Sequence, residues 1–124
     1  MSNKWGRNSV VEWQDRKRIL GMPISFTKYS LVSNEDWIKI FVKTGLLSTR
    51  EEEINLYRIY DITMSSSLGE KIFGVGTITL YSKDESTPCL QLLHIKNPNQ
   101  VRNMLATKIE EEKVKRGFRV AEFN

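Results

Sequence analysis

Few side chains in this sequence have the types and spacing that catalysis or metal binding requires. His94 is the single histidine and lies in an alternating run, and Cys89 is the single cysteine. A nucleophile or general base acts with partners inside hydrogen-bonding reach, and no partner for either residue stands at motif spacing. We therefore expect no catalytic residue, no metal site and no cofactor. We interpret His94 as structural or solvent-facing, and Cys89 as a small buried side chain.

Two further patterns could bind ions, but each has a simpler structural explanation. Glycines at 69, 74 and 76 could form a phosphate loop, yet the segment lacks the Gly-Lys-Ser/Thr ending of such loops. Glycine also permits a sheet to bend or two backbones to approach closely, and we favour that role. The glutamates at 51–53 could hold a cation, but neighbouring strand residues point to opposite faces. We interpret them as a charged edge that discourages strand pairing.

Positive charge gathers at the two ends of the sequence. The net charge is +4, to which residues 1–20 contribute +3, residues 21–100 contribute −1 and residues 101–124 contribute +2. A nucleic-acid-binding domain would spread its Lys and Arg over one face of the fold, so we do not expect nucleic acid as the main partner. If the two ends meet, they form one basic patch suited to an anionic partner. This patch would consist of Arg16, Lys17, Arg18, Lys113, Lys115 and Arg116.

The elements that must position these side chains are short strands followed by one helix. We expect strands over 24–31, 37–44, 46–54, 56–64, 77–81 and 89–95, with one helical turn near 68–73. Asn97 as the cap and Pro98 at the first position then begin a helix that ends at Gly117. The helix has one apolar stripe, which needs a surface to cover it. The stripe consists of Val101, Met104, Leu105 and Ile109.

The chain divides into an N-terminal arm at 1–20, a domain at 21–117 and a tail at 118–124. Trp13 is costly to leave in water, so the arm should dock on the domain or on a neighbouring subunit through Val10, Val11 and Trp13. A sheet that is not closed leaves an edge that can pair with another chain. We therefore expect self-association, with a monomer whose arm folds back on its own domain as the alternative.

Six short motifs follow one another in a fixed order along the chain: YSL at 29–31, TGLL at 44–47, LYRIYDI at 56–62, SLG at 67–69, FGVGT at 73–77 and KNP at 96–98. This ordered set resembles the bacterial pleckstrin-homology (PH) family. The resemblance implies a mainly β fold with one C-terminal helix: a strongly bent antiparallel sheet, or partly open barrel, capped by that helix. Glu12-Trp13 and Gly21-Met22-Pro23, ahead of these motifs, resemble the soluble, single-domain branch of the family. The hydrophobic spans of the membrane-bound branch are not found in this sequence.

The resemblance also implies a binding or assembly module and not an enzyme. Eukaryotic PH domains often bind phosphoinositides through basic residues on the first two strands and their loop. The loop at 31–36 of this sequence contains two carboxylates and no Lys or Arg. The remaining candidates for ligand contact are Lys28, Lys39 and Arg58, and we expect Arg58 to pair with Asp61.

We therefore expect a non-enzymatic PH-like module that acts through protein–protein contacts and self-assembly. The alternative is a binder of anionic surfaces, either lipid headgroups or nucleic acid, through the basic ends of the chain. One cysteine and an N-terminus without an apolar core predict a cytoplasmic protein that is not integral to a membrane, although peripheral contact is compatible with the sequence.

Overall fold

The computed structural model describes residue 5 and residues 8–117, and within them it contains seven strands and two α-helices. The strands are β1 (Val10–Arg16), β2 (Thr27–Ser33), β3 (Ile38–Thr44), β4 (Arg50–Asn55), β5 (Ile59–Ser65), β6 (Val75–Ser82) and β7 (Cys89–Lys96). A 3₁₀ turn, η1 (Leu56–Arg58), joins β4 to β5, and the short helix α1 (Leu68–Ile72) joins β5 to β6. The long helix α2 (Pro98–Lys115) follows β7. The predicted tail at 118–124 lies outside the described residues.

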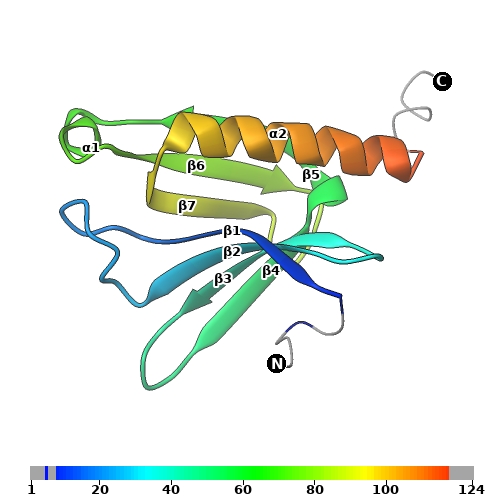
Figure 1. Cartoon of the computed structure of the whole chain (residues 1–124), viewed down its shortest axis with the longest axis horizontal. Coiled ribbons are helices and arrows are strands. Elements are labelled where there is room, and N and C mark those ends of the chain that lie inside the picture. The colour runs from blue at the N-terminus through cyan, green and yellow to red at the C-terminus, as the bar shows by residue number, and fades with distance from the viewer. Residues whose placement is uncertain (1–4, 6–7, 118–124) are drawn as a thin grey trace.

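The strands form two antiparallel sheets that are not closed into a barrel (Figure 1). The first sheet has the order β1-β2-β3-β4, and the second has the order β5-β6-β7. The sheets meet where β1 ends beside β7, because the Arg18 N–H donates to the His94 carbonyl over 2.9 Å. The mainly β architecture with a C-terminal helix is confirmed.

The core lies between the two sheets and α2. It is built from the alternate apolar residues of the strands, such as Leu31, Ile40 and Leu80, which are fully buried. The Tyr29 hydroxyl joins the sheets by accepting the Leu93 N–H over 2.9 Å, and burial raises the pKa of this phenol. In Figure 1, α2 runs along the second sheet, and it contacts β5, β6 and η1.

The limits and the buried face of α2 agree with the prediction from the sequence. Val101, Leu105 and Ile109 are buried, and Gly117 ends the helix with a φ of +78°. One detail of the prediction is wrong, since the Asn97 side chain makes no capping hydrogen bond. Asn97 has a φ of +52°, in the left-handed region, instead of the extended conformation of a usual cap.

A strand precedes the first strand that the sequence predicted. Residues 10–16 belong to the predicted arm, but they form β1 and pair with β2 along their length, with one irregularity between Val11 and Trp13. Trp13 packs against the core. The segment therefore docks on its own domain, which is one of the two sites that we expected for it. The period-two pattern is weak here because Val10 and Val11 are adjacent and do not alternate with polar residues. Both valines are exposed.

Gly76 confirms the interpretation of the glycine-rich segment as a close backbone approach. A Cβ at this position would lie 2.8 Å from Cγ of Pro98, at the start of α2. The register between β6 and β7 also shifts between Gly76 and Ile78. Gly76 therefore lets the first turn of α2 pack directly onto β6.

Candidate anion-binding site

Three basic side chains stand in one row across the first sheet. Arg16 on β1 is opposite Lys28 on β2, and Lys28 is opposite Lys43 on β3. Glu51 on β4 ends the row opposite Lys43, so the row carries three positive charges and one negative charge. Like charges directly opposite one another destabilise a sheet. Arg16 and Lys28 form one such pair, and Lys28 and Lys43 form a second.

The row lies on the outer face of the sheet because successive strand residues point to opposite faces. Tyr29 on β2 and Val42 on β3 are buried in the core, so their neighbours Lys28 and Lys43 point away from it. The same alternation brings Phe41 to the outer face beside Lys43.

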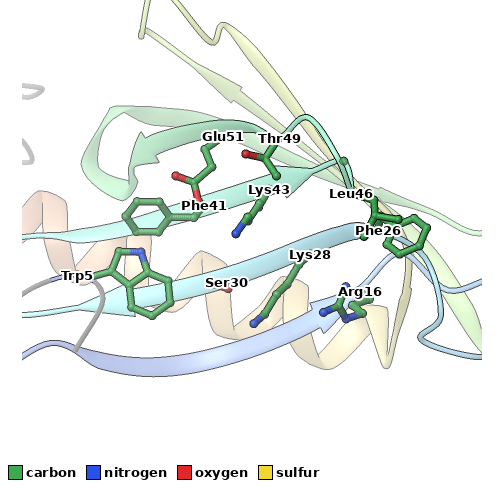
Figure 2. A pocket seen from close by; sticks show the side chains of 11 residues that line it. Trp5, Arg16, Phe26, Lys28, Ser30, Phe41, Lys43, Leu46, Thr49 and Glu51 are labelled. Atoms are coloured by element: carbon green, nitrogen blue, oxygen red, sulfur yellow. The ribbon is translucent and has the colours of Figure 1, made fainter. Parts of the chain in front are cut away.

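The side chains of this row line a hollow of about 320 Å³. The Trp5 and Phe41 rings, 5.7 Å apart between centroids, form an apolar wall on one side. Phe26 and Leu46 form the wall on the other side, where the loops begin (Figure 2). The rest of the lining is polar or backbone: Arg16, Lys28, Ser30, Lys43, Gly45, Thr49 and Glu51.

The charges in the hollow are only partly compensated. Among the described residues, neither Lys28 nor Lys43 forms an ion pair. The Arg16 guanidinium is held in place by its Nη1, which donates to the Ser25 carbonyl over 3.0 Å. Three cations placed between apolar walls favour an anion with an apolar part.

Lys39, another predicted ligand contact, differs from Lys28 although it lies on the same face. Its Nζ is 3.7 Å from Oε1 of Glu53 and 4.8 Å from the centre of the Trp37 ring. Lys39 also lies outside the lining of the hollow. Its charge already has partners within the fold.

Arg58, the third predicted contact, lies elsewhere and pairs differently from the prediction. Its Nη1 is 4.0 Å from Oδ2 of Asp84, whereas Oδ1 of Asp61 accepts the Ile62 N–H over 2.9 Å. Hydrogen bonds from the Ser86 hydroxyl and N–H hold the pKa of Asp84 below its ordinary value, and Arg58 adds a smaller effect. The expected pairing of Arg58 with Asp61 is wrong because η1 turns Arg58 toward the β6–β7 loop.

The two basic clusters predicted to form one patch lie at opposite ends of α2. Arg18 is beside His94 near the start of the helix, while Arg116 at its end donates to the Asp36 carbonyl over 2.7 Å. The helix has 18 residues and so spans about 27 Å. Arg16 lines the hollow, and Lys17 and Arg18 follow it in the chain. The second cluster, at the far end of α2, does not line the hollow; it consists of Lys113, Lys115 and Arg116.

β1 precedes the strand that we expected to be the first, so residues 31–36 join the second and third strands. The first two strands are joined by residues 17–26, which contain Lys17 and Arg18 and are flanked by Arg16 and Lys28.

Only two of the three basic residues in the row were predicted from the sequence. Lys28 was a candidate for ligand contact and Arg16 was assigned to the basic patch, whereas Lys43 was not predicted. Lys39, Phe41 and Lys43 alternate on one face of a clear strand, which is the signal for Lys43. Cross-strand register then depends on β1, whose pattern is weak.

The residues considered for catalysis are not assembled into a site. Cys89 is exposed, which corrects its interpretation as a buried side chain. Nε2 of His94 is 3.9 Å from Oε2 of Glu70. Burial would raise the pKa of Glu70, but hydrogen bonds from the Ser67 N–H and the Thr77 and Ser67 hydroxyls lower it below 4.5. No group of three His, Cys, Asp or Glu side chains among the described residues could hold a metal ion.

The predicted interface residues separate into two kinds. Trp13 is packed against the core, whereas Val10 and Val11 are exposed at the start of β1, an edge strand of the first sheet. Only the two valines therefore remain available for a contact between chains.

Comparison with known proteins identifies the family. Residues 23–109, more than half of the chain, match the family described as bacterial PH domain. No curated protein and no solved structure matches the chain. Among the described residues, no helix has the length and apolar character to cross a membrane. The match runs from β2 to residue 109 within α2 and agrees with the observed fold, so this chain belongs to the bacterial PH domain family.

Proposed function

We propose that this protein is a non-enzymatic PH-like module that binds a phosphate-bearing anion in the hollow on the first sheet. The observation that carries the proposal is the row of Arg16, Lys28 and Lys43, directly opposed on three strands. A bound phosphate would replace the repulsion within this row by charge-assisted hydrogen bonds. The binding energy would thus include relief of repulsion already present in the free protein.

The chemistry of the hollow indicates the class of ligand. Arg16 presents a planar guanidinium that can bind two phosphate oxygens, while the two lysines act as point charges beside it. The Ser30 and Thr49 hydroxyls also line the hollow and can donate to an oxygen. Trp5 and Phe41 offer apolar surface for a ring or chain attached to the phosphate. The predicted cytoplasmic location is compatible with such a ligand.

Titration with water-soluble phosphate compounds tests the proposal. Inorganic phosphate, glycerol 3-phosphate and a nucleoside monophosphate would be added to the isotope-labelled protein, with amide chemical shifts as the readout. We expect shifts centred on 28–30 and 41–51 and a dissociation constant that rises with salt. Lys28→Met and Lys43→Met should each weaken binding by about tenfold, the effect of losing one charge-assisted hydrogen bond.

Lys39→Met is the matched control, since it removes the same charge from the same face outside the hollow. It should leave the affinity within about twofold, because its charge acts at longer range and is screened by solvent. Equal losses for Lys39→Met and Lys28→Met, or no binding of any phosphate compound, would show that the hollow is not the site.

One observation favours self-association as a second function. Val10 and Val11 are exposed on an edge strand, which can pair with another chain. The double variant Val10→Ser, Val11→Ser should shift the mass measured by light scattering toward the monomer. A monomeric wild-type protein at high micromolar concentration would exclude this function.

A further inference from the structure

Exposed apolar side chains gather at one end of the molecule. Fourteen large apolar residues are exposed among those that the structure describes, and ten of them lie on the β1–β2 connection, the β3–β4 hairpin and the α1 segment. Figure 1 shows these three loops at the same end, away from the C-terminus of α2. The ten residues are Ile19, Leu20, Met22, Ile24, Phe26, Leu46, Leu47, Leu68, Ile72 and Phe73.

Direct contacts tie these three loops together. A Cβ placed on Gly21 would lie 3.6 Å from Cβ of Phe73, so the β1–β2 connection touches the α1 segment. The Gly45 N–H donates to the Phe26 carbonyl over 3.2 Å, which joins the β3–β4 hairpin to the same connection. We call residues 15–28, 43–51 and 66–74 the loop end.

The loop end is also the positively charged end. It contains seven basic and three acidic residues. The opposite end, residues 33–37, 55–59, 82–89 and 110–116, contains five basic and seven acidic residues. The molecule is therefore polarised along its length, and a negatively charged surface would attract the loop end and repel the other.

We propose that the loop end docks on the surface of a bilayer that contains anionic glycerophospholipid. The proposal rests on the phosphate-binding function above, since Phe26 and Leu46 belong both to the loop end and to the wall of the hollow. A phosphate held in the hollow would thus lie beside the apolar side chains that enter the membrane. The loop end would bind the bilayer and the hollow would bind one headgroup.

The shape and charge of the loop end favour a membrane over a second copy of the chain. Two copies that met through this face would bring together two surfaces with an excess of positive charge. Leu47 is 98% exposed at the tip of its hairpin, and Leu68 and Ile72 are exposed on the short helix α1. Separate apolar tips surrounded by Lys and Arg suit the boundary between headgroups and acyl chains.

Vesicle sedimentation tests this inference. The wild-type protein should bind vesicles of phosphatidylcholine with phosphatidylglycerol and show little binding to phosphatidylcholine alone. Each Lys or Arg that lies near an anionic membrane surface raises the affinity of a protein for that membrane by about fivefold. The double variant Leu47→Gln, Ile72→Gln should lose at least about tenfold, because two side chains no longer enter the apolar layer. Val114→Gln is the matched control, since Val114 is exposed at the opposite end of the molecule.

The outcomes separate this inference from the function on which it rests. The double variant should retain wild-type affinity for glycerol 3-phosphate, because neither residue lines the hollow. Binding of glycerol 3-phosphate without binding to anionic vesicles would overturn the membrane inference and leave the proposed function standing. Vesicle binding that the double variant retains would also overturn it. A dimer that this variant dissociates, or a soluble acidic protein bound in place of vesicles, would identify a different occupant.

Discussion

Replacement of Lys28 by methionine should stabilise the protein. Methionine keeps an unbranched side chain of similar length but removes the charge, so packing along the stem changes little. Lys28 stands directly between Arg16 and Lys43 in the sheet register. The substitution therefore removes two opposed like-charge pairs at once.

The size of the effect follows from these two pairs. Directly opposed cross-strand pairs are worth about 0.2–1 kcal/mol each, and partly exposed pairs fall in the lower part of that range. We expect a gain of about 0.5–1 kcal/mol in the free energy of unfolding, or about 2–4 °C in melting temperature. The gain should largely vanish at 1 M salt, where the Debye length is about 3 Å.

Thermal unfolding in 10 mM and 1 M sodium chloride, followed by circular dichroism, measures the effect. Lys39→Met provides the comparison of opposite sign, because it breaks the ion pair with Glu53 and the contact with the Trp37 ring. It should lower the stability by about 0.5–1 kcal/mol. If Lys28→Met lowers the melting temperature in low salt as Lys39→Met does, the row stores no repulsion that a bound anion could relieve.

Three further predictions concern stability. Leu105→Ala should cost about 2–5 kcal/mol in chemical denaturation because Leu105 is fully buried; a smaller loss would mean that α2 is loosely packed. Gly76→Ala should cost about 1–3 kcal/mol because its Cβ would overlap the Pro98 ring, while Gly69→Ala, with no atom near its Cβ, is the control. Glu70→Gln should destabilise the protein at neutral pH. Because the folded pKa of Glu70 is lowered, its contribution is complete above the ordinary value of 4.5 and is lost as the pH falls through the lowered pKa. Melting curves of the two proteins should therefore converge in acid, and a constant difference would contradict the role of the carboxylate.

The elements with a strong period were predictable from the sequence. α2 has apolar residues on one face and Pro98 and Gly117 at its ends, so both its limits and its buried side were evident. β3 alternates over its whole length, and the Asn34 turn before it was recognised from its residue types. Local chemistry was sufficient for these features.

The site depended on information that local patterns do not contain. Val10 and Val11 do not alternate with polar residues, since an irregularity in the pairing follows them, so β1 was interpreted as an arm. Because the sequence did not predict β1, it gave no register that would place Arg16 beside Lys28 and Lys43. Trp5 precedes the strand by several residues, and only the fold brings it to Phe41.

The position of β1 has a practical consequence for anyone who divides this chain into fragments. The family match begins at residue 23, whereas β1 ends at Arg16. A fragment cut at the family boundary would leave the backbone N–H and C=O groups of β2 without their partners from β1. It would also lose Asp15, whose carboxylate accepts the Lys96 N–H over 2.9 Å before α2 begins. Such a fragment would expose a long unpaired strand and would tend to aggregate. Failure to obtain it in soluble form would reflect the cut and not the stability of the complete domain.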